Sequence, residues 1–235
     1  HENEIAQSES FTSEQFAKIW MHAGMITING EKMSKSVGNV KSINHVLESW
    51  GPNVARLFCI SGHYSKPIDY TEELLKENLI RLRQIETCYY ELRLANKTEE
   101  LEDISSLLKE SREKFDAALN DDFNTSLALS VFFNMIKTIN SLASDEKISK
   151  NVSEQALPVL EYMLEVLGLK VQTVSDEEIK STFELINERE KLRNEKKFEE
   201  ADKIRDQIAS LGISLIDHKN KTLWMKKEAI KAEKQ

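Results

Sequence analysis

Residues 30–39 read Gly30-Glu31-Lys32-Met33-Ser34-Lys35-Ser36-Val37-Gly38-Asn39. Lys32 and Lys35 lie three residues apart, with Ser34 and Ser36 beside them. Ammonium groups on flexible stems suit phosphate oxygens that move during a reaction, and two of them can stabilise the charge that develops on an attacked triphosphate. A lone pair of lysines at this spacing is more often a solvated basic loop. The ammonium groups of Lys32 and Lys35 together with the hydroxyls of Ser34 and Ser36 therefore predict a loop that can bind a triphosphate such as ATP.

The segments on either side of this loop predict how it is held. Met25–Ile28 is a short apolar run, typical of a buried strand that delivers the loop from its carboxyl end. Ser13–His22 predicts a short helix that begins at Ser13. After the loop, the sequence predicts one helix from Ser42 to Trp50 and a second from Asn53 to Ser61, separated by Gly51-Pro52.

Four longer amphipathic helices are predicted next, from Glu72 to about Ala95, Ile104 to about Leu119, Leu127 to Ala143 and Val152 to Leu167. Their short connections favour a bundle. Between the second and third, the polar run Asn120–Thr125 indicates a turn. The paired Asp121 and Asp122 raise a metal site as an alternative, but capping of the following helix by Asn124 and Thr125 explains the run better.

The remaining residues predict a smaller unit. Two charged helices, from Glu177 to about Lys196 and from Phe198 to Leu211, precede strands at Ile213–Ile216 and Thr222–Lys226, which we expect to pair as a ribbon. Glu228–Gln235 is expected to be a loose tail. The predicted fold class is therefore mainly α, with a small α+β unit at the C-terminus.

The composition limits the class of protein. Of 235 residues, 40% are hydrophobic and 31% charged, which favours folded, solvated helices over disorder. Cys59 and Cys88 lie far apart and are expected to be buried thiols in a reducing compartment. We find no run of eighteen apolar residues, so a cytoplasmic protein without membrane contact is expected. The net charge of −8 disfavours nucleic-acid binding in general, but three acids against six lysines from Asp217 onwards leave the end of the chain locally basic.

The run Lys32–Ser36 is the K-M-S-K-S signature of class I aminoacyl-tRNA synthetases. Together with His1–Ser8, Trp20–Met25 and Leu119–Thr125, it resembles the cysteinyl-tRNA synthetase family over essentially the whole chain. The resemblance implies three parts: residues 1–70 as the end of a Rossmann-like catalytic domain with its stem-contact region, residues 71–170 as a DALR-type helical bundle that docks tRNA, and residues 171–235 as a small anticodon-binding domain.

The resemblance implies a ligase that activates cysteine with ATP and Mg²⁺ and transfers it to its tRNA. We expect this ligase to be a monomer. Lys32 and Lys35 would be the catalytic residues, clamping the triphosphate. The family also binds Zn²⁺ through two cysteines, a histidine and a glutamate. Of that set only Glu4 is present, because the chain starts at the second of two adjacent histidines. We therefore expect the C-terminal portion of a longer protein, inactive without the N-terminal catalytic half.

Contacts with tRNA are expected in the last part of the chain. Trp224, flanked by lysines on a strand, would stack on an unpaired base or pack on the helical hairpin, and the resemblance favours the base. Arg189, Arg193, Arg205 and Asp206 are further candidates for anticodon contacts.

Two alternative functions remain at this point. One is a ligase that passes activated cysteine to an amino-sugar, which should need no anticodon reader. The other is a tRNA-binding module without catalysis, which has little reason to keep Lys32–Ser36 intact.

Overall fold

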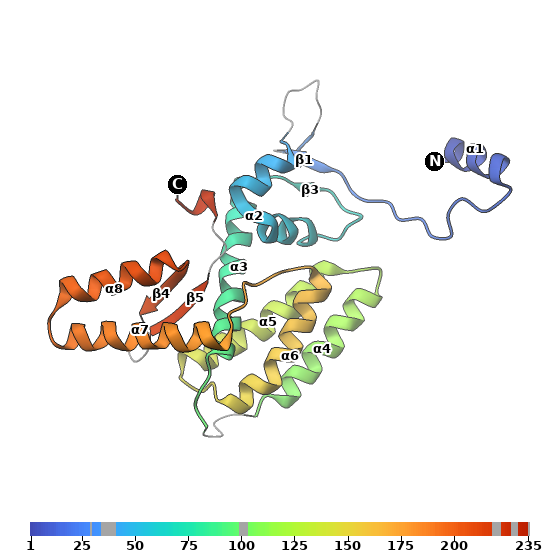
Figure 1. Ribbon diagram of the computed structural model, residues 1–235. Helices are drawn as coiled ribbons and strands as arrows, with labels where there is room; N and C mark the ends of the chain where they lie inside the picture. The colour runs from blue at the N-terminus through green and yellow to red at the C-terminus, as the bar shows by residue number, and fades with distance from the viewer. Residues whose placement is uncertain (29, 34–40, 99–102, 218–221, 227–229, 235) are drawn as a thin grey trace.

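The computed structural model describes residues 1–28, 30–33, 41–98, 103–217, 222–226 and 230–234, and it is mainly helical (Figure 1). The chain runs from an N-terminal extension through a small sheet and a kinked helix into a helical bundle. It ends in a helical hairpin with a two-stranded ribbon. This arrangement confirms the predicted fold class.

The N-terminal extension differs from the prediction. Helix α1 spans Glu2–Thr12, and Ser13 ends it in the left-handed conformation (φ 56°) instead of capping a following helix. The helix predicted over Ser13–His22 is wrong, since these residues are non-helical. Short helices are stable mainly when an apolar face is buried. Ile19, an apolar residue of the predicted helix, is instead 81% exposed.

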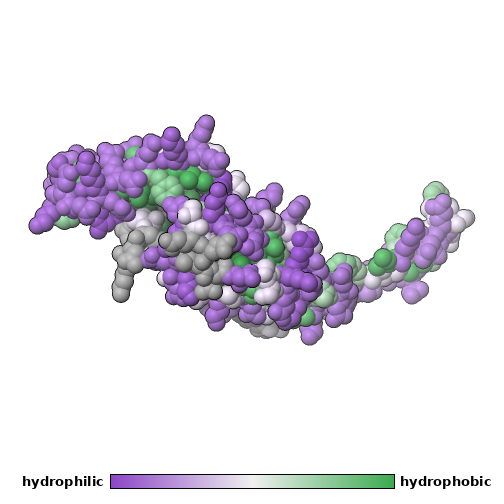
Figure 2. Space-filling model, turned by 90° about the horizontal axis from the view of Figure 1, so that it is seen from below, coloured by the Kyte–Doolittle hydropathy of each residue, from purple (hydrophilic) through white to green (hydrophobic). Residues whose placement is uncertain are grey.

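The extension stands apart from the body of the molecule (Figure 1). Apolar side chains are exposed along it, as the green residues on the narrow arm in Figure 2 show. They are Phe11, Phe16, Ile19, Trp20, Met21 and Met25. A series of this kind on one segment is typical of a surface that another folded part covers.

A small three-stranded sheet contains Lys32, the first residue of the signature. It has the order β2-β1-β3, with β1 at Ile26–Ile28, β2 at Glu31–Lys32 and β3 at Ile68–Asp69. β1 pairs with β2 in antiparallel fashion and with β3 in parallel fashion. A strand is thus present within the predicted Met25–Ile28, but the predicted burial is wrong, since Met25 is 52% and Ile26 42% exposed. The other two strands were not predicted.

Helix α2 spans Ile43–Ile60 and replaces the two predicted helices. Ser42 caps it by accepting a hydrogen bond from the His45 amide at 3.2 Å. Gly51 breaks the regular geometry (φ 77°, ψ 165°) ahead of Pro52, so the predicted interruption is present as a kink inside one element. Val54 and Leu57 beyond the kink are fully buried and anchor α2 in the core.

The four predicted bundle helices are all present as α3 (Glu72–Arg93), α4 (Ser105–Asn120), α5 (Thr125–Ser144) and α6 (Lys150–Leu167). α3 packs against α2, α5 and α6, and α4 packs against α5 and α6. Capping accounts for several of the boundaries: Thr71, Asn124 and Ser149 each accept a backbone hydrogen bond at a helix start. The capping interpretation of Asn124 is therefore confirmed.

Helix α5 has the length and apolar composition to span a membrane, alone among the helices of the described residues. One face of it nevertheless lies in the bundle core, with Phe132, Met135 and Ile139 fully buried. Such burial is typical of the central helix of a bundle, which passes the same compositional test.

The C-terminal unit is a hairpin of α7 (Asp176–Asn194) and α8 (Phe198–Ser210) followed by strands β4 (Ile213–Asp217) and β5 (Thr222–Lys226). The strands pair in antiparallel fashion, with Leu215 opposite Trp224. β4 contacts α8 and β5 contacts α3, so the ribbon lies between the hairpin and the bundle (Figure 1). The predicted hairpin and ribbon are confirmed.

The C-terminal residues are not simply a loose tail. Ile230 is buried at 2% exposure, and the short 3₁₀ helix η1 (Lys231–Lys234) contacts α2. The prediction of a loose tail is therefore wrong for these residues, while residues 227–229 and 235 lie outside those described. Sequence pattern missed this because one isoleucine among lysines shows no periodicity, and its partner helix lies far away in the chain.

Candidate functional site

The signature residues emerge from the β1–β2 hairpin. Lys32 is exposed on β2 and pairs with Thr27 of β1, while Glu31 pairs with Ile28. Gly30 in the turn has φ 77°, a conformation that glycine adopts without strain. Ser34, Lys35 and Ser36 lie outside the described residues. Of the four predicted ATP-binding residues, the structure thus places Lys32, at the end of a short and defined strand.

Asp69 of the neighbouring strand β3 is hydrogen-bonded to the β1–β2 hairpin. Its Oδ1 accepts a hydrogen bond from Thr27 Oγ1 at 2.6 Å and another from the Gly30 amide at 2.9 Å. These two donors, the Thr27 hydroxyl first, lower the pKa of the Asp69 carboxyl below its ordinary value. Asp69 is therefore a carboxylate that joins the strand before the turn to the turn itself.

The segment before β1 also lies close to the loop that leads into β3. The Gly24 amide donates to the Tyr64 carbonyl oxygen at 2.7 Å. A Cβ added to Gly24 would lie 2.1 Å from the Lys66 carbonyl oxygen, so only glycine fits. The two segments that flank the sheet are thus in direct backbone contact at one edge.

The junction between this sheet and the bundle contains a polar cluster. Tyr64 donates its hydroxyl to Asp122 Oδ1 at 2.8 Å, a bond that raises the pKa of the tyrosine. The His63 ring stacks on Tyr64 and its Nε2 lies 3.7 Å from Asp122 Oδ2. Thr125 completes the link by donating to the Gly62 carbonyl oxygen at 3.2 Å. These contacts give Asp122 a role in packing two parts of the chain together.

Trp224 is a core residue. It is 0% exposed, and its indole lies against the rings of Tyr90 on α3 (5.8 Å between centroids) and Phe183 on α7 (6.3 Å). The predicted stacking of Trp224 on a base is therefore contradicted, because no face of the indole reaches the surface. The alternative, packing, is the arrangement observed, and it extends to the bundle as well as the hairpin.

The other tRNA candidates divide by exposure. Arg189 on α7 is buried at 3% exposure, so it also departs from its predicted role as an anticodon contact. Arg193 near the end of α7, and Arg205 and Asp206 on α8, are exposed. The C-terminal unit thus presents three of the five predicted residues to solvent and keeps two inside, Arg189 on α7 and Trp224 on β5.

Glu4 lies exposed on α1, in the extension. Among the residues that the structure describes, no group of three or more His, Cys, Asp or Glu side chains could hold a metal ion. A zinc site takes about four ligands, so the described residues do not by themselves fit one. Asp121 and Asp122 belong to no such group within the described residues either.

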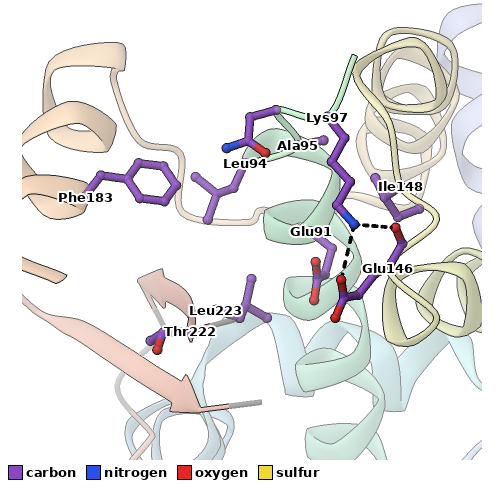
Figure 3. Close-up of a pocket in the computed structure, with 10 residues that line it drawn as sticks. Glu91, Leu94, Ala95, Lys97, Glu146, Ile148, Phe183, Thr222 and Leu223 are labelled. Atoms are coloured by element: carbon purple, nitrogen blue, oxygen red, sulfur yellow. Dashed lines mark hydrogen bonds and ion pairs between the residues drawn. The ribbon is translucent and has the colours of Figure 1, made fainter. Parts of the chain in front are cut away.

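Sequence pattern gave no indication of a cavity of about 210 Å³ at the end of the bundle (Figure 3). It is lined from α3, the α5–α6 connection, α7 and β5, including Glu91, Ile148, Phe183 and Leu223. On its wall the Lys97 ammonium donates to the carbonyl oxygen of Glu146 at 2.8 Å and lies 3.3 Å from its carboxylate. The cavity marks where the C-terminal unit meets the bundle, far in sequence from the signature residues.

Comparison with known protein families gives two matches. A family described as the catalytic domain of class I (C) tRNA synthetases matches residues 1–79, and the DALR domain matches residues 114–172. The first match includes the β1–β2 hairpin with Lys32, and also Asp69. The second match includes most of the helical bundle.

Curated relatives match nearly the whole chain. They include cysteine–tRNA ligases from Caldicellulosiruptor saccharolyticus (37% identity, 92% of this chain and 48% of the relative), Bacillus velezensis (38%, 97% and 50%) and Thermococcus onnurineus (39%, 95% and 50%). The chain spans about half the length of each. Among solved structures, a leucyl-tRNA synthetase of Agrobacterium radiobacter K84 in complex with tRNA overlaps 60% of this chain and 20% of its own, at 20% identity and a TM-score of 0.49.

Proposed function

We propose that this chain, which is similar in sequence to about half the length of curated cysteine–tRNA ligases, serves in an enzyme that activates cysteine with ATP and transfers it to tRNA. The observation that carries the proposal is the uninterrupted Lys32–Ser36 signature, delivered by a hairpin at the edge of a small sheet. An amino-sugar ligase would need no anticodon reader, and a module that only binds tRNA would need no signature.

In the proposed reaction the carboxylate of cysteine attacks the α-phosphate of ATP and pyrophosphate leaves. Lys32 and Lys35 stabilise the negative charge that shifts towards pyrophosphate, and the hydroxyls of Ser34 and Ser36 donate hydrogen bonds to phosphate oxygens. ATP enters as its Mg²⁺ complex. Catalysis here is electrostatic and positional, since neither half-reaction needs a covalent enzyme intermediate.

We assign a separate role to each of three parts of the chain. Residues 1–70 contribute to the nucleotide site, residues 71–170 dock tRNA, and residues 171–235 approach the anticodon. Arg193, Arg205 and Asp206 are the exposed candidates for that contact, whereas Trp224 and Arg189 support the hairpin from inside.

Several finer points belong to the same proposal. The enzyme acts as a cytoplasmic monomer. The exposed apolar residues of the extension pack against the remainder of the catalytic domain in an enzyme of the relatives' length. Glu4 supplies one zinc ligand there, and no step of the reaction is assigned to zinc. Metal analysis of the full-length enzyme and its Glu4→Ala variant tests that assignment, with a lower zinc content expected in the variant.

The decisive experiment measures cysteine-dependent exchange of pyrophosphate into ATP in the full-length enzyme. Lys35→Ala and Lys32→Ala are each expected to lower kcat by about 10²-fold, the typical effect of removing a group that stabilises transition-state charge. Lys41→Ala is the matched control, an exposed lysine just after the signature. Unchanged exchange in both signature variants, or exchange that does not depend on cysteine, would refute the proposal. Residues 1–235 alone are expected to show no exchange.

A further inference from the structure

We propose that Asp69 is a positioning residue for the ATP step, because its carboxylate fixes the turn from which Lys32 and the rest of the signature emerge. The inference rests on the proposed function of the signature. It adds a residue 37 positions beyond Lys32 in the sequence, on a strand that the sequence pattern did not predict.

Oδ1 of Asp69 supports the β1–β2 hairpin through two hydrogen bonds. Asp69 lies beside Thr27 in the parallel register of β1 and β3. From there its Oδ1 accepts from the Thr27 hydroxyl at 2.6 Å and from the Gly30 amide at 2.9 Å. One acceptor thus joins the strand that enters the turn to the turn itself, and Lys32 follows Gly30 by two residues.

Asp69 can act as an anchor because its own strand is fixed to the core. The next residue, Tyr70, donates its amide to the Thr27 carbonyl oxygen at 2.8 Å and is 9% exposed. Its ring packs edge-on against Phe58 of α2, with 5.8 Å between centroids. A continuous path therefore runs from the core of α2 through Tyr70 and Asp69 to Gly30.

The strand that follows the turn is short. β2 contains only two residues and Lys32 is exposed. Gly30 has positive φ, and a Cβ added to it would meet nothing within 4 Å, so close packing does not fix it. A charged acceptor makes a stronger hydrogen bond to a backbone amide than a neutral one. The lowered pKa of Asp69 indicates that the carboxylate is the form these donors favour.

The test compares variants of the full-length enzyme. Asp69→Ala removes the acceptor, whereas Asp69→Asn keeps an oxygen at Oδ1. We expect Asp69→Ala to lower kcat for pyrophosphate exchange about ten- to hundred-fold, the range for misplacing a group by about 1 Å, with KM for cysteine unchanged. Asp69→Asn should restore most of the rate. Hydrogen exchange of the peptide that contains Gly30 should be faster in Asp69→Ala and near wild type in Asp69→Asn.

Asp103→Ala is the matched control. Asp103 Oδ1 also accepts from a backbone amide, that of Ser105 at 2.9 Å, and its pKa is lowered for the same reason, but it lies at the start of α4. This variant should leave both kcat and the Gly30 peptide unchanged. A wild-type rate in Asp69→Ala overturns the inference alone, as does a loss of rate with normal exchange at Gly30. A wild-type enzyme with no cysteine-dependent activity overturns the inference together with the proposed function.

Discussion

Asn53 and Lys170 form a two-point contact that joins α2 to the segment after α6. The side-chain Nδ2 of Asn53 donates to the Lys170 carbonyl oxygen at 2.8 Å, and its Oδ1 accepts from the Lys170 amide at 2.9 Å. Asn53 is 7% exposed, so neither bond is easily replaced by water. The part of the chain that carries the signature is thereby tied to the connection between the bundle and the C-terminal hairpin.

We expect Asn53→Asp to destabilise the protein. The aspartate keeps the acceptor but loses the donor, and it places a charge beside the Lys170 carbonyl oxygen. An unsatisfied buried group of this kind lowers the free energy of unfolding by about 1–3 kcal/mol. Urea denaturation of the protein measures the difference. Asn187→Asp, an exposed site on α7, is the control, and equal midpoints for both variants would contradict the structural role of Asn53.

The position of Trp224 in the core can be tested with one substitution. Trp224→Leu keeps an apolar side chain but removes the aromatic face. If the indole is a core residue, the variant should lose about 2–4 kcal/mol of stability through the cavity it leaves, with tRNA affinity unchanged at temperatures where it is folded. If the indole stacks on a base, affinity should fall by about 1–3 kcal/mol. Denaturation and filter binding on the same samples separate the two.

The helical part of the fold could be predicted because its signals are local. The apolar stripes of α3 to α6 repeat at helical spacing, and Asn124 marks a helix start by its own hydrogen-bonding chemistry. Gly168, with φ 67°, ends α6 as the sequence indicates. None of these assignments needs knowledge of what lies elsewhere in the chain.

The parts that could not be predicted depend on distant partners. The burial of Trp224 is decided by Tyr90 on another helix, and the role of Asp69 by Thr27 and Gly30 across the sheet. The helix expected at Ser13 is not formed, and Ile19 within that segment remains 81% exposed. β2 is the exception, since the Asn29-Gly30 pair between Ile28 and Glu31 in the sequence is a typical two-residue hairpin signal.

The contact between Glu178 and Lys226 predicts an acid-sensitive C-terminal unit. Glu178 accepts from the Lys226 ammonium and from the Ser175 amide, which closes a capping box at the start of α7. Both bonds, that from Lys226 first, lower the pKa of Glu178. A lowered folded-state pKa contributes stability that is fully present above the ordinary glutamate pKa of about 4.3 and is lost as the pH falls through the folded-state value.

Glu178→Gln should therefore lower stability at neutral pH and flatten the acid side of the stability curve. Melting temperatures between pH 3 and pH 7 measure this effect, with Glu177→Gln as the control on the neighbouring residue, which makes no capping contact. Parallel acid curves for wild type and Glu178→Gln would show that the ion pair adds nothing to the pH dependence.

Removal of exposed cations from the hairpin should weaken tRNA binding in a salt-dependent manner. Arg193 and Arg205 are exposed on α7 and α8, in a protein of net charge −8, so local cations must supply the attraction to phosphate. A side chain that contacts one phosphate contributes about one unit to the slope of log affinity against log salt. Arg193→Gln and Arg205→Gln are each expected to lower tRNA affinity and reduce that slope by roughly this amount, measured by filter binding between 50 and 200 mM salt.

The control must remove the same charge from the same hairpin. Lys180→Gln does so, because Lys180 is exposed near the start of α7 and, at thirteen residues from Arg193, faces a different side of the helix by the 3.6-residue period. A general field effect would change all three variants equally, whereas a defined contact surface would spare Lys180→Gln. Equal losses in all three would therefore exclude Arg193 and Arg205 as specific contacts and leave only the net charge of the unit as the source of affinity.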